Sequence, residues 1–514
     1  MFIRRKPNKS GSVSVQLVDK TGGRYKVLAS VGTGRTEQEL MHLERRARVQ
    51  MSRYESLPLF ADYGLENDLD RLVEMLSNSQ VNVIGPELIF GALYDHIGYN
   101  TVDNDLFRDL VVSRLFHPGS KLKTVDYMRR YHNTSHSPSS VYRYLDRLCE
   151  RDGGVDIKEC VERVTYAHTL KVLGGEISVV FYDLTTLYFE ASDEDDLRRC
   201  GFSKDGKHSN PQVFLALLTA AGGNPIGYEV FEGNIFEGDT FIPVISRLSE
   251  RFGFGRPIVI ADAGLLSRKN IKALADAGYT YILGARIRNE SQRNKQAILD
   301  LNLDYGQTGV IRREDGTRLV ISKSLKRAKK DMANRKRGMA KLVKRLGSGH
   351  LTKEHLNNRG YNRYLKLEGE VNISIDMERF DQDAVWDGIK GYLTNTDLSD
   401  KEVIDNYSSL WMIERAFRMN KTDLQMRPIY HRLHNRIKGH ICICFTAYTI
   451  MLELERALAS AGSTITVSRA MEIVKNMYQL TYVHPDSMRQ RSIILKMDDE
   501  QQELYDIITK HCRT

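Results

Sequence analysis

The chain has 514 residues, of which 41% are hydrophobic and 27% are charged, and its formal net charge is +9. This composition is typical of a globular protein and excludes a disordered or fibrous one, while the length exceeds what a single hydrophobic core usually holds. No stretch offers about 18 consecutive apolar residues, and no apolar segment follows the basic N-terminus. We therefore expect no membrane partner, no secretory signal and a cytoplasmic location.

Positive charge is concentrated in two regions of the chain. Residues 323–346 contain eleven Lys and Arg residues against one acidic residue, and residues 1–50 contain eleven against four. Charge gathered in this way suits a polyanion, and nucleic acid is the leading candidate. A solvated surface helix is the alternative interpretation of residues 323–346.

The six cysteines lack the paired spacing of a zinc site, so we expect reduced thiols. Cys442 and Cys444 follow His440 closely, but they lie in an apolar run. This setting is more typical of small core residues than of metal ligands.

The first 170 residues predict two parts. Residues 1–60 read as a basic β-hairpin module over 12–31, turning at Thr21-Gly22-Gly23, followed by a linker helix over 36–51. Residues 61–170 are predicted to be helical and to bind DNA. One helix is expected to start at Pro86, and three more are expected over 103–116, 120–131 and 137–150. The last two resemble a helix-turn-helix, with Arg143 as a candidate DNA contact and plain helix packing as the alternative.

Residues 171–288 alternate between strands and helices, which predicts the first part of a mixed α/β core. The expected strands cover 177–182, 212–219, 225–231, 257–261 and 280–284, and the expected helices cover 240–251 and 267–277. The helices that would close this core come only after about a hundred further residues.

The remaining residues predict an insertion and then a return to the core. Residues 289–388 are predicted as a β-rich insertion domain, with alternating stretches at 309–322 and 361–375 around a basic helix over 323–346. Residues 389–460 are predicted as the second part of the core, and 461–514 as a C-terminal helical region. The expected elements are a strand over 391–395 and helices over 407–421, 440–458 and 468–478.

Three acidic residues stand out as candidate metal ligands. Asp183 and Asp262 each follow an apolar strand, and Glu414 lies between Tyr407 and Lys421 at seven-residue intervals, which favours one face of a helix. Acids at the carboxyl ends of central strands lie where α/β sheets bind ligands. Three such acids suffice for two-metal phosphoryl transfer. Taken singly, each also has an ordinary explanation as a turn residue or a surface glutamate.

The three blocks around these acids resemble those of DDE transposases with a ribonuclease H-like fold. They are Phe-Tyr-Asp183-Leu-Thr-Thr, Ala-Asp262-Ala-Gly and Tyr407…Glu414…Lys421, and they resemble the bacterial insertion-sequence group with a Tyr-Arg-Glu-Lys signature. Leu410 stands at the Arg position of that signature. Arg415 or Arg418 is the candidate substitute for the missing phosphate contact.

The resemblance implies a DNA transposase that cleaves transposon ends and transfers the strand into target DNA. It implies Mg²⁺, with Mn²⁺ as a substitute, held by Asp183, Asp262 and Glu414. The implied partners are double-stranded DNA, in the form of terminal repeats and target, and a second copy of the chain in a homodimer, in a bacterial, nucleoid-associated setting. The candidate DNA contacts are Tyr407, Lys421, Arg415, Arg418, Lys326, Lys330, Arg337 and Arg143.

Two other functions remain open from the sequence. A metal-dependent nuclease without strand transfer would use the same acids, and a catalytically inactive DNA-binding regulator would keep only the basic surfaces. Trp386 and Trp411 are expected in the core, with stacking on an unpaired DNA base as the alternative.

Overall fold

A computed structural model describes residues 1–20, 23–55, 80–102, 105–131, 134, 136–149, 156–201, 203, 206, 209–265, 267–348, 360–368, 372–483 and 490–513. The chain divides into two compact units. The first comprises Met1–Pro86, Asp126–Ser135 and Glu472–Glu503, and the second comprises Glu87–Val125, His136–Met471 and Leu504–Thr514. In the described part of the chain, no helix is long and apolar enough to span a bilayer.

The first unit contains two small antiparallel sheets. The N-terminal sheet has three strands where the sequence predicted two, because residues 2–7 pair with the predicted hairpin. Its elements are β1 (Phe2–Pro7), β2 (Val13–Asp19), β3 (Lys26–Gly34) and the helix α1 (Glu37–Glu55). Val15, Leu17 and Leu40 are buried in the small hydrophobic core between this sheet and α1. Thr21 and Gly22 of the predicted turn, and the predicted boundary at residue 60, lie outside the described residues.

The second sheet of this unit corrects the prediction that residues 461–514 are wholly helical. Its strands are β4 (Val81–Val83), β15 (Tyr478–Val483) and β16 (Gln490–Ile494). Residues 478–483 lie in the predicted helical region but form a strand, because their backbone pairs with both neighbouring strands. The helices near this end of the chain are α16 (Val467–Ile473) and α17 (Asp499–His511).

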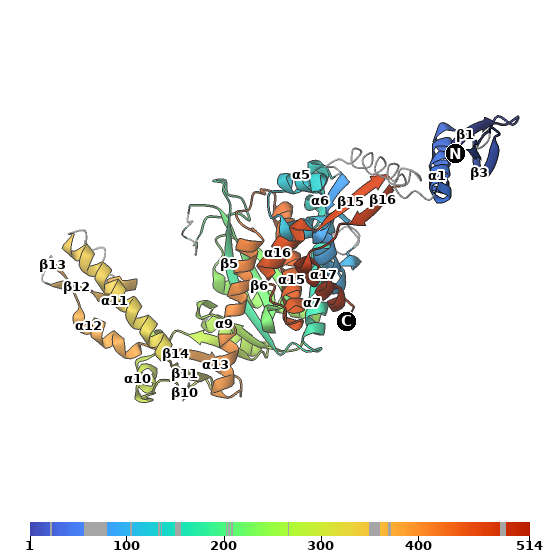
Figure 1. The fold of residues 1–514 in the computed structure, drawn as a ribbon. Coiled ribbons are helices and arrows are strands. Elements are labelled where there is room, and N and C mark those ends of the chain that lie inside the picture. Colours follow the sequence, from blue (N-terminus) through green and yellow to red (C-terminus); the bar gives the residue numbers. More distant parts are fainter. Residues whose placement is uncertain are drawn as a thin grey trace. The chain divides into compact units, whose positions relative to one another are not determined.

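An eight-stranded mixed sheet forms the centre of the second unit, which confirms the α/β prediction (Figure 1). Its order is β10-β11-β14-β9-β8-β5-β6-β7, with β5, β8 and β9 parallel and the other pairs antiparallel. The strands are β5 (Val179–Tyr188), β6 (Gln212–Ala220), β7 (Pro225–Glu232), β8 (Ile258–Ala261), β9 (Tyr281–Ala285), β10 (Thr308–Arg312), β11 (Arg318–Lys323) and β14 (Ile389–Thr394).

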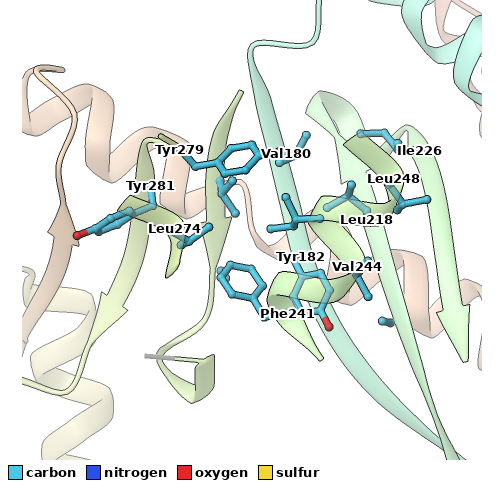
Figure 2. Packing of buried hydrophobic residues seen from close by; sticks show 14 of the residues in the cluster. Val180, Tyr182, Leu218, Ile226, Phe241, Val244, Leu248, Leu274, Tyr279 and Tyr281 are labelled. Atoms are coloured by element: carbon cyan, nitrogen blue, oxygen red, sulfur yellow. The ribbon is translucent and has the colours of Figure 1, made fainter. Parts of the chain in front are cut away.

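The core of this sheet is built from side chains that the alternation of the strands points to one face. Val180, Tyr182 and Leu218 from the strands meet Val244 and Leu274 from two helices (Figure 2). Those helices are α8 (Phe241–Phe252) and α9 (Arg268–Asp276). Ser267 begins α9 by accepting a hydrogen bond from the Asn270 backbone N–H, and Gly253 ends α8 in a left-handed conformation.

Further helices of the second unit come from several parts of the chain. They are the π-helix η2 (Glu87–Gly91), α3 (Ala92–Ile97), α4 (Asp105–Phe116), α6 (Pro138–Arg147), α7 (Ile157–Val172), α10 (Gln292–Asp300), α13 (Asp400–Ser408), α14 (Trp411–Arg418) and α15 (His434–Ser460). The 27-residue α15 is almost wholly buried and packs against α4, α6 and α7. Cys442 and Cys444 are fully buried in it, as the core interpretation predicted.

The predicted helix-turn-helix corresponds to α5 (Lys121–Tyr131) and α6. Residues 132, 133 and 135 of the connection lie outside the described part of the chain. Contact of these helices with DNA stays a prediction.

The predicted insertion differs in extent and content from what is observed. Residues 308–323 form β10 and β11, which extend the core sheet because β11 pairs with β14. The part that leaves the sheet, which we call the arm, runs from Ser324 to Gly388. Its described elements are α11 (Leu325–Gly347), β12 (Leu365–Glu368), β13 (Asn372–Ile375) and α12 (Met377–Gln382). Figure 1 shows the basic helix α11 beside the β12–β13 ribbon. Leu342 of α11, Tyr364 and Phe380 of α12 belong to one buried cluster of the arm.

Candidate active site

Two of the three candidate acids come from neighbouring parallel strands. β5 and β8 pair in register up to Tyr182 opposite Ala261, so the next residue along each chain is Asp183 or Asp262. Asp262 follows the end of β8, as predicted. Asp183 lies within β5 and not after it, because β5 continues past the end of its pairing with β8 and pairs in the antiparallel direction with β6 as far as Tyr188. Asp183 is half-buried and Asp262 is exposed.

The prediction of one continuous helix from Tyr407 to Lys421 is wrong. α13 ends at Ser408, α14 covers Trp411–Arg418, and Lys421 lies in the π-helix η11 (Met419–Asp423). At the break, the backbone N–H of Leu410 donates to the Tyr407 carbonyl oxygen, in the tighter 3₁₀ pattern. Leu410 occupies the position where the Tyr-Arg-Glu-Lys signature has Arg. Its side chain is buried, so this position belongs to the hydrophobic core. Tyr407, Glu414 and Lys421 therefore lie on three successive helical elements and not on one α-helix.

Tyr407 connects α13 to the strand acids. Its hydroxyl donates a hydrogen bond to Asp262 Oδ1 over 2.9 Å, and its side chain is buried. A Cβ at Gly284 of β9 would collide with this hydroxyl oxygen, so the approach of the phenol requires glycine there. Burial and the Asp262 carboxylate raise the pKa of Tyr407, which keeps the phenol a hydrogen-bond donor at neutral pH.

Lys390 is a further candidate residue of this site, which the sequence motifs did not indicate. It lies on β14, and its Nζ is 4.2 Å from the centroid of the Tyr407 ring. Burial and Arg327 lower the pKa of Lys390, while the carboxylates of Asp262 and Glu414 act in the opposite direction. Its signal in the sequence is a lone charge in the otherwise uncharged strand Ile389–Thr394.

Glu414 is exposed on α14, a helix that packs against β5. Its charge acts on both Tyr407 and Lys390, as that of Asp262 does. The elements that carry the three acids are therefore in contact. β5, which carries Asp183, pairs with β8, which precedes Asp262, and packs against α14, which carries Glu414.

The chemistry of these donors fits hard divalent cations, because all three offer carboxylate oxygens. Their oxygens do not form a compact group, since in the described part of the chain the only three His, Cys, Asp or Glu ligand atoms within 4.8 Å of one another lie elsewhere. A wider spread is expected for ligands of a metal pair, because the two ions themselves stand about 3.5–4 Å apart.

A groove of about 640 Å³ begins at Asp262 and continues to the base of the arm. Six cationic side chains and three acidic ones line it, so it is positive on balance. The cations are Arg286, Arg288, Arg327, Arg335, Arg363 and Lys390, and the acids are Asp262, Asp331 and Asp387. Trp386 and Tyr361 also line it. A positive groove with aromatic walls is typical of nucleic-acid binding.

The other predicted DNA contacts lie at several places in the second unit. Lys326, Lys330 and Arg337 are exposed on α11, and Arg143 is exposed on α6. Arg418 is exposed on α14, and Lys421 is half-buried. Arg415 forms an ion pair with Glu455 over 2.6 Å, which makes it the weaker substitute for the missing Arg.

The two tryptophans do not share one environment. Trp386 packs against the cluster of Ile287, Ile298 and Leu319 and also lines the groove. Trp411 is 53% exposed, so the prediction that it lies in the core is wrong. It is the first residue of α14 and directly follows the buried Leu410.

Comparison with known proteins gives one family match. A family model described as Transposase DDE domain matches residues 174–450, more than half of the chain. Among solved structures, the chain is similar to the cryo-EM structure of a piggyBac transposase synaptic complex with hairpin DNA. The sequence identity is 11%, the TM-score is 0.39, and the match covers 83% of this chain and 84% of that one. No curated protein matches the sequence.

Proposed function

This chain belongs to the family of transposase DDE domains, and on that premise we propose that it cleaves DNA strands at transposon ends and joins them to target DNA. The observation that carries the proposal is the meeting of three chain segments. β5 and β8 bring Asp183 and Asp262 side by side, and the Tyr407 hydrogen bond to Asp262 anchors the segment that leads into Glu414. The mixed sheet would then be the ribonuclease H-like core.

Transposases with DDE domains generally depend on divalent metal ions. Asp183, Asp262 and Glu414 would hold Mg²⁺, with Mn²⁺ as a substitute, because their carboxylates supply the oxygen donors that these ions prefer. When bound, such ions activate the attacking oxygen and stabilise the leaving one.

The proposed reaction needs no covalent protein intermediate. In cleavage, a water oxygen bonds to the phosphorus and the bond from phosphorus to the 3′ oxygen breaks, which leaves a 3′-hydroxyl and a 5′-phosphate. In strand transfer, that 3′-hydroxyl oxygen bonds to a target phosphorus, and the 3′ oxygen of the target strand leaves and takes a proton. Both steps exchange one P–O bond for another.

The protein's own residues would position the DNA and the acids. Tyr407 fixes the orientation of Asp262 through its hydrogen bond. Lys390, Arg286 and Arg327 line the groove next to Asp262, where they would neutralise backbone phosphates. Trp386 presents an aromatic side chain to the same groove, which suits stacking on an unpaired base.

The exposed face of α11 would add affinity that does not depend on sequence. Lys326, Lys330 and Arg337 would contact the phosphate backbone of DNA entering the groove. We also propose a homodimer on paired transposon ends, in the bacterial nucleoid, as the resemblance implies.

The test uses DNA duplexes that carry the inverted repeats flanking the coding region, a supercoiled target plasmid and Mg²⁺. Wild-type protein should cut the duplex ends and join them to the plasmid. Asp262→Asn and Glu414→Gln should bind the duplex but neither cut nor join it. Asp405→Asn, an exposed carboxylate on α13, is the matched control and should retain both activities.

Other outcomes of this experiment would favour one of the alternative functions or refute the site. Cutting without joined products, even from duplexes supplied with a free 3′-hydroxyl, would identify a nuclease. Binding without cutting by the wild type would identify an inactive regulator. Undiminished cutting by Asp262→Asn would refute the site.

A further inference from the structure

A second group of metal-ligating side chains lies in the second unit, on elements that contribute none of the three acids. His96 of α3, Glu453 of α15 and His511 at the end of α17 place one ligand atom each within 4.8 Å of the others. Glu453 is only 2% exposed, and both histidines are half-buried. The three residues are far apart in sequence, so only the fold brings them together.

The two oxygens of Glu453 have separate surroundings. Oε2 accepts hydrogen bonds from His168 Nε2 over 2.7 Å and from the Arg456 guanidinium. Oε1 faces the other two imidazoles, with His511 Nε2 at 2.7 Å and His96 Nε2 at 3.8 Å. One carboxylate oxygen is therefore held in place while the other meets two ring nitrogens.

We propose that His96 Nε2, Glu453 Oε1 and His511 Nε2 bind a late first-row divalent cation, for which Zn²⁺ is the best match, and that it fastens the end of α17 to α3 and α15. Two imidazoles and one carboxylate, with water in the fourth position, are a donor set that holds zinc in proteins. Mg²⁺ prefers oxygen ligands alone, so this site would discriminate against the ion expected at the acids.

The geometry needs small changes to accept the ion. Zinc–ligand bonds of about 2.0–2.1 Å in a tetrahedron place ligand atoms about 3.4 Å apart. The observed separations from Glu453 Oε1, 3.8 Å and 2.7 Å, straddle that value. On metal binding, the ring proton of His511 must move from Nε2 to Nδ1. This change breaks the hydrogen bond to Glu453 but leaves the net charge of the His511 ring unchanged.

The supporting contacts are those of a metal site. His168 and Arg456 orient the ligating carboxylate, and the His96 ring hydrogen-bonds the backbone of Cys512. Metal-binding histidines and carboxylates usually have such outer partners, which fix ring orientation and tautomer.

The competing explanation is a metal-free hydrogen-bond centre, in which Arg456 alone compensates the charge of Glu453. The test uses full-length protein carrying Asp183→Asn and Asp262→Asn, so that the candidate active site does not bind the probe. The protein is stripped with a chelator and titrated with Co²⁺ and then Zn²⁺ in excess Mg²⁺. We expect one equivalent of Co²⁺ with the intense visible absorption of four-coordinate cobalt, displacement by Zn²⁺, and a higher melting temperature with Zn²⁺.

Three substitutions in the same background assign the signal. His511→Gln should abolish the cobalt spectrum and the zinc-dependent rise in melting temperature. His168→Gln should weaken Zn²⁺ binding about 10- to 100-fold, as loss of an outer partner does. His136→Gln is the matched control, because His136 is paired with Asp109 at a distance of 2.7 Å and is not part of the cluster. This variant should bind Zn²⁺ like its parent.

Circular dichroism of the stripped proteins shows whether each variant folds, and the half-buried His511 is the position least dependent on packing. Failure of the parent to bind Co²⁺ or Zn²⁺ would overturn the proposal in favour of the hydrogen-bond centre. Equal binding by a folded His511→Gln variant would also overturn it.

Discussion

Replacing Tyr407 with Phe tests how the helical segment is joined to the strand acids. The change removes one oxygen and the 2.9 Å hydrogen bond to Asp262 while the buried ring stays. Hydrogen bonds contribute about 0.5–1.5 kcal/mol to stability, and water can replace this one at the exposed Asp262. We expect the free energy of unfolding to fall by about 1 kcal/mol.

The effect on the reaction should be larger than the effect on stability. Loss of a partner that orients a metal ligand typically costs about 10- to 100-fold in metal affinity or activity. We therefore expect Tyr407→Phe to cut transposon-end DNA about 10- to 100-fold more slowly in single turnovers at saturating protein, with little change in DNA affinity. Tyr392→Phe is the matched control, because Tyr392 is also buried and its ring lies 5.0 Å from that of Tyr407.

The same experiment separates positioning from DNA contact. If Tyr407 bound a backbone phosphate, the Phe variant would lose DNA affinity and cut bound DNA at the wild-type rate. That outcome would refute the reasoning from the Asp262 hydrogen bond.

Three further predictions concern other parts of the chain. Asp183→Asn should leave DNA binding nearly unchanged and stop Mg²⁺-dependent cleavage, and a variant that cleaves at the wild-type rate would contradict the assignment. Replacing Lys326, Lys330 and Arg337 with Ala should reduce the slope of log affinity against log salt by about 0.9 per lost phosphate contact, without changing end-sequence preference, as fluorescence anisotropy can measure. Burial, with Lys121 and Arg114 nearby, lowers the pKa of His431 from 6.5 to about 3, so below pH 6.5 the unfolded chain binds a proton that the folded chain does not. The part of the stability that depends on His431 should therefore decrease as the pH is lowered below 6.5, by up to about 1.4 kcal/mol per pH unit. In urea unfolding, His431→Gln should reduce the pH dependence of stability by that amount; an unchanged slope would show that His431 does not contribute.

The three acids could be proposed as a site from the sequence because each is tied to local signals, and their role stays a prediction. Asp262 follows a short apolar strand, and Glu414 lies in a motif whose spacing is visible without a fold. The elements around them were also largely predictable, since the alternation of strands and the apolar periodicity of helices are local properties.

Features that depend on tertiary contacts were not predictable. The heptad spacing of Tyr407, Glu414 and Lys421 suggested one helix, but the chain tightens to a 3₁₀ hydrogen bond at Leu410 and the α-helix is broken there, which the spacing does not reveal. Lys390 matters only because β14 pairs beside β9, a pairing across about a hundred residues. β10 and β11 join the core sheet for the same reason, because β11 pairs with β14 across the whole arm and β10 pairs with β11.

The attachment of the arm has a consequence for how the protein could change. Lys323 and Ile389 are paired residues of adjacent antiparallel strands, and the Ser324 N–H donates to the Gly388 carbonyl oxygen over 3.0 Å. Everything from Ser324 to Gly388 therefore occupies the place of a hairpin loop. Because the closure entropy of a loop grows only slowly with its length, segments of very different size can be exchanged there while the register of the sheet is preserved. The arm and the three acids can thus diversify independently.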